Sequence, residues 1–103
     1  MPSSYSIIIK PQALEDILSI ASYIAEESGD LGVALSWEMS IHEHLSRLEL
    51  FPHGYSSAEV QPYRKLIHGR YLIYFRIDAD ERNVIVCRVV NGMMFLKNVG
   101  PIE

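Results

Sequence analysis

Cysteine is almost absent from this 103-residue sequence, which has only Cys87 and so cannot form a disulfide within the chain. Long apolar runs are also missing, and none approaches the roughly 18–20 residues that a membrane-spanning helix needs. The first residues, 1–4, lack the basic region and the apolar stretch of a secretory signal peptide. Together these absences argue against a disulfide-stabilised secreted protein or a membrane protein, and we expect a cytoplasmic one.

Basic residues are scarce in the first part of the chain. Residues 1–59 carry nine acids and two bases, whereas residues 60–103 carry four acids and seven bases. The basic part fits a surface that meets an anionic partner, and it equally fits a face that is merely solvated. The net charge of −4 argues against direct DNA binding, which relies on neutralising many phosphates.

Apolar residues make up 49% of the chain, which excludes a disordered protein. A chain of this length can build one core without metal or disulfide support, so we expect a single domain over residues 1–103.

A strand and a helix are predicted at the start. The β-branched run over residues 5–9 is typical of a strand. Pro11 suits the first turn of a helix, and apolar residues then recur at helical spacing to about residue 28. Gly29 ends this helix, because glycine readily adopts the left-handed conformation found there. Asp16 lies near the helix start, where the helix dipole favours acids.

A second helix is predicted from Asp30, a suitable N-cap, to about Phe51, before Pro52. The short link between the helices indicates an antiparallel hairpin. Residues 52–62 show no periodicity and are expected to form a loop, long enough in so small a domain to suggest a role.

Three strands are predicted in the last part, over residues 63–68, 71–77 and 84–90. The short turns between them indicate an antiparallel meander. The expected fold is α+β in the order β-α-α-β-β-β, with a two-helix antiparallel hairpin packed on one face of a mainly antiparallel four-stranded sheet.

Short motifs follow one another in a fixed order from the first helix to the last strand. They are ALEDI at 13–17, RKL at 64–66, GRYLIY at 69–74 and VIVCRVV at 84–90. In order and spacing they resemble the ParE/RelE superfamily, the toxins of bacterial type II toxin–antitoxin and plasmid stabilisation systems.

The resemblance implies one of two activities. RelE-like members are ribosome-dependent mRNA endoribonucleases, and ParE-like members inhibit DNA gyrase by protein binding. The RelE pattern implies a catalytic Arg where this chain has Leu72, with Arg70 close by. It also implies a His or Arg and then a Tyr where this chain has Asn91 and Phe95. Because the expected acid–base set is missing, we expect no catalytic residues and favour the ParE-like branch.

Two alternatives remain open. The usual ParE motif His-Gly-Arg-Arg-Asp survives only at Gly92, so the chain could be a decayed, non-toxic antitoxin-binding module. It could also be a RelE-like endoribonuclease that binds phosphates through the basic residues Arg64, Lys65, Arg70 and Arg88.

The residues expected to bind a partner or target are basic residues of the strands and a group around the apolar cluster after Gly92. They are Arg64, Lys65, Arg70, Arg76, Arg88, Asn91, Met93, Met94 and Phe95. Strand alternation places Arg64 and Lys65 on opposite faces. Arg76 and Arg88 interrupt apolar strands and each needs an anion, either an acid on the helices or an acidic surface of a partner. The apolar cluster either meets a partner or folds back on the core.

The resemblance also implies a cognate antitoxin that wraps around the toxin, in addition to DNA gyrase as target. An exposed edge, the first or the last strand, suits such a partner. A homodimer and a toxin–antitoxin hetero-oligomer are both open. We expect no cofactor and no metal, since His42 and His44 point to different sides of a helix. Cys87 and Trp37 are expected to be packing residues.

Overall fold

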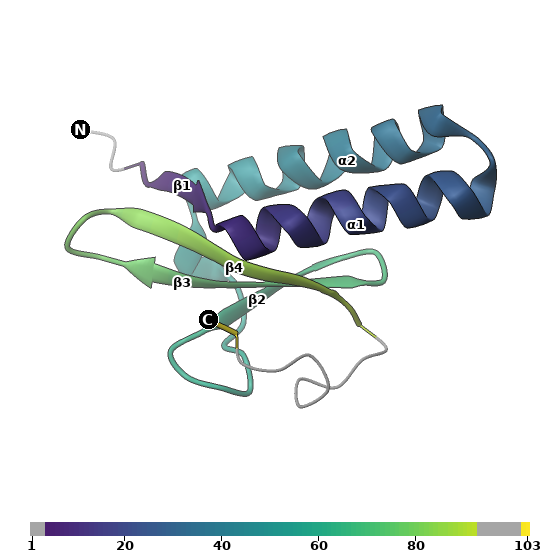
Figure 1. The fold of residues 1–103 in the computed structure, drawn as a ribbon. Coiled ribbons are helices and arrows are strands. Elements are labelled where there is room, and N and C mark those ends of the chain that lie inside the picture. Colours follow the sequence, from purple (N-terminus) through teal and green to yellow (C-terminus); the bar gives the residue numbers. More distant parts are fainter. Residues whose placement is uncertain (1–3, 93–101) are drawn as a thin grey trace.

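The helices and strands follow the predicted order. The computed structural model describes residues 4–92 and 102–103. Figure 1 shows its elements: β1 (Ser6–Ile9), α1 (Pro11–Ser28), α2 (Leu31–Ser46), β2 (Arg64–His68), β3 (Tyr71–Asp78) and β4 (Asn83–Asn91). Two 3₁₀ helices, η1 (Arg47–Glu49) and η2 (Pro52–Gly54), lie between α2 and β2. Within the described part, no helix has both the length and the hydropathy to cross a membrane.

The strands form one sheet in the order β1-β4-β3-β2. The pairs β2–β3 and β3–β4 are antiparallel, as predicted, and β1 lies parallel to β4. The helical hairpin supplies the long connection that a parallel pair requires. Of the two strands considered as an exposed edge, β1 is an edge, whereas β4 lies inside the sheet.

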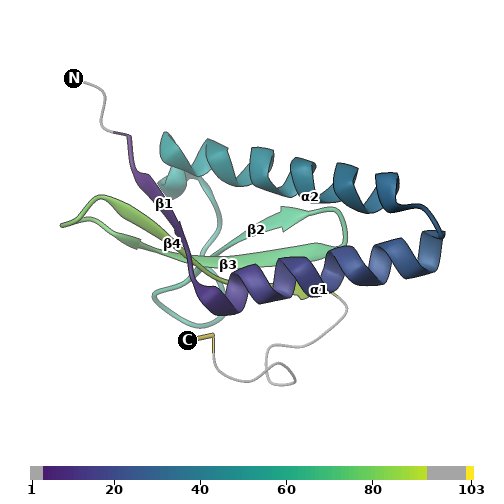
Figure 2. The same cartoon turned by 45° about the horizontal axis from the view of Figure 1, so that its top comes forward.

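Both ends of α1 and the start of α2 lie at the predicted residues. Pro11 begins α1, and Gly29 ends it with a φ of 68° while its N–H donates to the Ala25 carbonyl. Asp30 is the N-cap of α2, and its carboxylate accepts a hydrogen bond from the Gly32 N–H at 2.8 Å. The two helices lie side by side and antiparallel (Figure 2).

The predicted end of the second helix at Phe51 was wrong. The α-helix ends at Ser46, and the chain tightens into η1. Leu48 in η1 is fully buried, so the apolar spacing continues past the α-helix and does not mark the change. The tighter turn presents the Glu49 carbonyl to the Tyr5 N–H at 2.7 Å, which joins η1 to the start of the chain.

The hairpin covers one face of the sheet, here called the helix-side face (Figure 1). Its core is built from buried apolar side chains of both layers: Ala13, Ile17, Ile41, Leu45, Leu48, Leu66, Tyr71, Ile73, Phe75, Val84, Val86 and Val89. Trp37 packs against this core, which confirms its prediction as a packing residue.

The opposite, open face carries a smaller apolar cluster of Ala58, Tyr74, Cys87, Val90 and Ile102. Burial of Cys87 confirms its prediction as a packing residue. A bulge explains the spacing in β4, because Tyr74 pairs with Arg88 while Phe75 pairs with Val86. The extra residue, Cys87, allows Val86 and Val89 to share the helix-side face although they are three positions apart.

Candidate functional site

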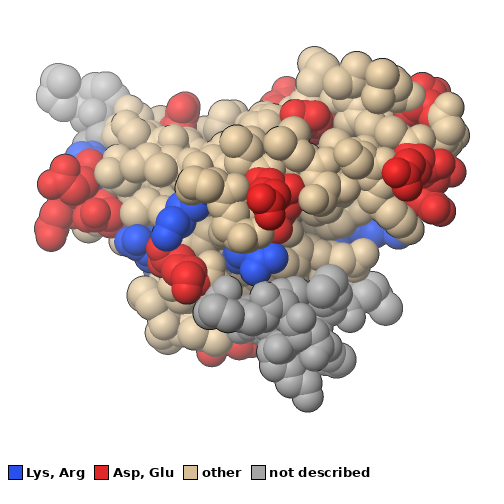
Figure 3. All heavy atoms as spheres, viewed as in Figure 1, with Lys and Arg blue, Asp and Glu red and all other residues tan. Residues whose placement is uncertain are grey.

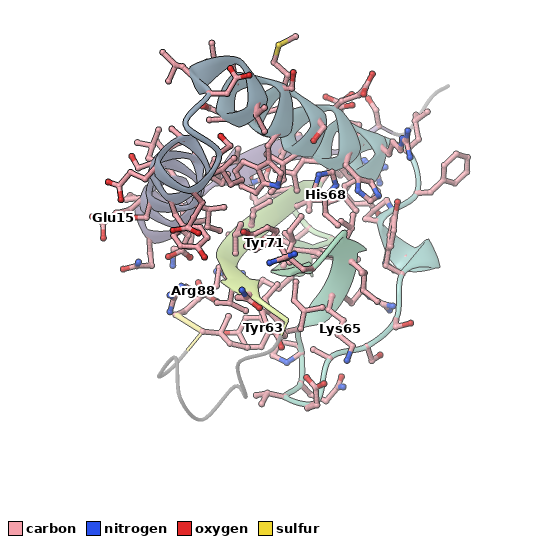
Figure 4. The ribbon with its side chains drawn as sticks, turned by 90° about the vertical axis from the view of Figure 1, so that its right-hand side faces the viewer. Glu15, Tyr63, Lys65, His68, Tyr71 and Arg88 are labelled. Atoms are coloured by element: carbon pink, nitrogen blue, oxygen red, sulfur yellow. The ribbon has the colours of Figure 1, made fainter. Side chains whose placement is uncertain are left out.

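The predicted contact residues lie in three separate places. Lys65 and Arg76 are on the open face, since each pairs across the sheet with a residue of the open-face cluster or one packed against it. Lys65 forms an ion pair with Glu59 at 2.7 Å, and Arg76 forms one with Glu103 at 2.6 Å. Figure 4 shows Lys65 on the side of the sheet away from the helices.

Arg64 lies apart from its neighbour Lys65. Its guanidinium donates to the Tyr55 carbonyl at 2.7 Å, and it pairs across the sheet with Phe75 of the helix-side core. This confirms the prediction that Arg64 and Lys65 occupy opposite faces. Arg64 therefore holds the loop before β2 against the sheet.

Arg88 has an anionic partner on the helices, which is one of the two alternatives that the sequence left open. Its guanidinium donates to the Asp16 carboxylate at 2.8 and 3.2 Å, and the same carboxylate accepts the Val89 N–H at 2.9 Å. Strand β1 pairs with β4 only as far as Val86, so Asp16 takes over the edge of β4 that β1 leaves. Asp16 thus serves as a clamp between α1 and β4. It lies beyond the first turn of α1, which contains no acid, so the expected interaction with the helix dipole is not its main role.

The anion that Arg76 contacts is Glu103, which is not on the helices, so this alternative for Arg76 was wrong. The Glu103 carboxylate accepts from Arg76 and also from Lys10 Nζ at 2.6 Å and the Tyr63 hydroxyl at 2.8 Å. Residues 10 and 103 are far apart in the sequence, and no local pattern links them. The apolar cluster Met93, Met94 and Phe95 lies outside the described residues.

A groove opens between α1 and the end of the sheet, here called the helix–sheet groove. It consists of two hollows of about 330 and 500 Å³ that share Tyr23 and Tyr71. The first is also lined by Arg88 and Asn91, and the second by Arg70. Figure 4 shows Tyr71 between the helical hairpin and the strand end. Tyr23 and Tyr71 were not among the residues expected to bind a partner.

Gly92 closes the end of β4 against the β2–β3 turn. Its N–H donates to the Arg70 carbonyl at 2.6 Å, and a Cβ at this position would lie 2.9 Å from that oxygen. Only a glycine fits such a close approach without movement of the backbone. Gly92 therefore fixes Arg70 and Asn91 at the same end of the sheet.

A histidine pair joins α2 to β2. His44 Nδ1 and His68 Nδ1 are 2.9 Å apart, and the Ser40 hydroxyl lies 3.0 Å from His68 Nε2. Burial lowers the pKa of both rings, and for His44 the nearby His68 and Arg47 lower the pKa further. No trio of His, Cys, Asp or Glu side chains that could hold a metal occurs within residues 4–92 and 102–103. The sequence reading missed this pair because its members are 24 positions apart.

Exposed apolar side chains lie on the two helices. Large ones include Leu14, Leu18, Leu31, Leu35 and Met39. Figure 3 shows the helical layer from the side, with most of the visible atoms uncharged, acids gathered at the end of the hairpin and a few nearer its middle, and basic groups mostly along the sheet layer. A surface with so many exposed apolar side chains is typical of a protein that binds another protein.

Comparisons with known proteins agree with the fold. Residues 7–94 match the family described as ParE toxin of type II toxin–antitoxin system, parDE. No match was found among curated protein sequences.

Solved structures provide three further likenesses. A chain of the chromosomal ParDE toxin–antitoxin system from P. aeruginosa superposes with a TM-score of 0.76 at 18% identity, covering 86% of this chain and 97% of that one. A chain of the RelBE2 toxin–antitoxin complex from Mycobacterium tuberculosis superposes with a TM-score of 0.56 at 16% identity, covering 85% of this chain and 98% of that one. A mutant of E. coli toxin RelE in the free state superposes with a TM-score of 0.61 at 12% identity, covering 85% of this chain and 83% of that one. At these identities the likeness extends to the fold alone.

Proposed function

We propose that this chain, which belongs to the ParE toxin family of type II toxin–antitoxin systems, inhibits DNA gyrase by protein contact when it is free of its antitoxin. In this proposal the chain works by binding, without bond-breaking chemistry. A cognate antitoxin holds it inactive in the cytoplasm.

The dispersion of the cations carries this proposal. Cleavage of RNA without a metal needs cations gathered around one phosphate, with an acid and a base beside them. Here Lys65 and Arg76 are ion-paired on the open face, Arg64 binds a loop carbonyl, and Arg88 is clamped to Asp16. The four cations thus occupy three separate places, and each contacts an acceptor within the chain, which favours a binding protein over a ribonuclease.

The exposed helix surface and the helix–sheet groove support the antitoxin as partner. An amphipathic segment can cover apolar side chains such as Leu18 and Met39, which are 51% and 73% exposed. The ParDE and RelBE2 structures of similar fold come from toxin–antitoxin systems. We therefore expect the small protein encoded beside this chain to co-purify with it, and light scattering of the complex would give the stoichiometry.

The experiment that tests the gyrase proposal is a supercoiling assay with purified gyrase and relaxed plasmid. We expect the free protein to abolish supercoiling and the pre-formed toxin–antitoxin complex to leave it unchanged. An equal amount of thermally unfolded protein is the control for non-specific inhibition. Normal supercoiling in the presence of excess folded protein would overturn the proposal.

A ribosome-dependent mRNA cleavage assay tests the second candidate, the RelE-like endoribonuclease. Two observations favour this candidate: the similarity to free RelE and the exposed Arg70 beside the helix–sheet groove. We expect intact mRNA. Cleavage that Arg70→Ala abolishes would establish the ribonuclease instead, and antitoxin binding without either activity would indicate a decayed toxin.

A further inference from the structure

Ile102 and Glu103 are seated on the open face, far from the helical hairpin. Ile102 is only 6% exposed and packs with Ala58, Tyr74, Cys87 and Val90. Figure 1 shows that the end of the chain reaches the side of the sheet that the helices leave uncovered. An apolar residue followed directly by an acid thus fills a site on the face of the sheet that the helices leave uncovered.

Three donors from different parts of the chain converge on the Glu103 carboxylate. Lys10 Nζ donates to Oε2 at 2.6 Å, and the Tyr63 hydroxyl donates to Oε1 at 2.8 Å. Arg76 donates through Nε to Oε1 at 2.6 Å and through Nη2 to Oε2 at 3.2 Å. Chiefly because of Arg76, the pKa of Glu103 falls to about 2, so the site holds an ionised carboxylate.

We infer that this face is a binding site for a segment of the antitoxin in which an apolar residue is followed by an acid, and that Ile102 and Glu103 occupy the site in the free toxin. The inference rests on the proposed antitoxin partner. The residues that line this site are here called the acid-binding site. Its donors to the carboxylate are Lys10, Tyr63 and Arg76, and Cys87 and Val90 lie under the apolar side chain.

Charge and shape indicate this class of occupant. Without Glu103, Lys10 and Arg76 would bring two positive charges to the edge of an apolar patch. Such a surface attracts a carboxylate and repels basic segments. The site also lies outside the helix-side core, so an incoming segment replaces Ile102 and Glu103 without disturbing the packing beneath the helices.

Cys87 reports on the occupancy of this site. It is 1% exposed beneath Ile102, and burial together with the charge of Glu103 raises its pKa to about 11. It is also the sole cysteine of the sequence, so a thiol reagent reads out this position alone. A free site exposes the thiol and lowers its pKa, and both changes speed its reaction.

The first measurement is the rate at which a thiol reagent labels Cys87 in the folded protein. We expect slow labelling of the wild type and labelling of the Glu103→Ala variant faster by about tenfold or more. The Lys65→Ala variant removes a charge from the same face without touching Glu103, and it should label as slowly as the wild type. Equal rates for Glu103→Ala and the wild type would contradict occupancy by Ile102 and Glu103.

The second measurement adds a synthetic peptide that copies residues 98–103 to the Glu103→Ala variant. We expect the peptide to slow Cys87 labelling again, whereas the same peptide with Gln in place of its Glu does not. The requirement for an acid would be overturned if both peptides slowed Cys87 labelling equally, or if neither slowed it.

The third measurement tests the antitoxin as occupant. We expect Arg76→Ala to weaken antitoxin binding about tenfold and Tyr63→Phe, a milder change that keeps the ring, to weaken it less. The peptide should compete with the antitoxin. Equal antitoxin binding by wild type and both variants would refute the inference and leave the proposed function intact. No antitoxin binding by the wild type would refute both.

Discussion

The two faces of the sheet are closed in different ways. The helix-side face is covered by two helices, and its core includes fully buried side chains such as Phe75, Ile17 and Ile41. Among the residues that the structure describes, a loop residue, Ala58, and Ile102 pack on the open face, with charged side chains around them. The first arrangement fixes the fold, whereas the second leaves groups that a partner can replace.

Two ion pairs show the same contrast. Arg88 and Asp16 have side chains only 16% and 11% exposed, and their contact joins α1 to β4 inside the fold. Arg76 and Glu103 are more exposed, at 33% and 20%, and their contact holds a short segment on the open face. Similar chemistry thus clamps two core elements in one place and retains a replaceable segment in the other.

The largest effect is expected when the helix-side core is opened. The Phe75→Ala change removes a fully buried ring, and we expect it to lower the free energy of unfolding by about 3–5 kcal/mol. Ile102→Ala, the matched change on the open face, should cost less than half as much, because the vacated space opens to water. Urea unfolding followed by circular dichroism measures both. Equal losses would show that the two faces contribute alike.

A smaller effect is expected from the Asp16 clamp. Asp16→Ala leaves the Arg88 guanidinium and the Val89 N–H without this carboxylate, and we expect a loss of about 2–3 kcal/mol. Asp16→Asn keeps an acceptor for the N–H and should lose less. A cost for Asp16→Ala no larger than that for Glu103→Ala would contradict the distinction between the two ion pairs.

The fold could be predicted because its boundaries have local causes. Pro11 and Gly29 mark the two ends of α1, and Asp30 marks the start of α2. Each acts through its own backbone or side chain. The end of α2 could not be predicted, since Leu48 continues the apolar spacing into a 3₁₀ turn. The β4 bulge at Cys87 likewise has no local mark in an apolar run.

The contacts of the candidate site could be predicted only where the nature of a single residue was enough to require a partner. An Arg in an apolar strand needs an anion, and Arg88 meets this expectation with Asp16 on α1, one of the two kinds of partner that the argument allowed. Arg76 also has an anion, but the argument could not identify it as Glu103, because the two residues are 27 positions apart and meet only in the tertiary structure. The His44–His68 pair and the convergence of Lys10 and Tyr63 on one carboxylate depend likewise on tertiary structure.

The smallest effects, and the sharpest comparison, come from pH. On the helix side, the pKa values of His44 and His68 are lowered, chiefly by burial, from the 6.5 of a free imidazole. The unfolded chain therefore takes up protons at a higher pH than the folded one, and stability falls as the pH drops below about 6.5. On the open face, Glu103 has a pKa of about 2 instead of 4.5. Its contribution is present above pH 4.5 and is lost as the pH falls towards 2.

The stability contribution of each face should thus depend on pH in its own range, and one variant removes the titrating group of each face. Urea midpoints measured from about pH 7.5 to about pH 3 should decline less steeply between about 6.5 and 5 in His44→Gln than in the wild type. The Glu103→Gln variant should follow the wild type over that range and differ in slope only below about pH 4.5. If Glu103→Gln instead altered the upper window, the segment on the open face would be coupled to the histidine pair across the sheet. The two faces would then have to be treated as one cooperative unit.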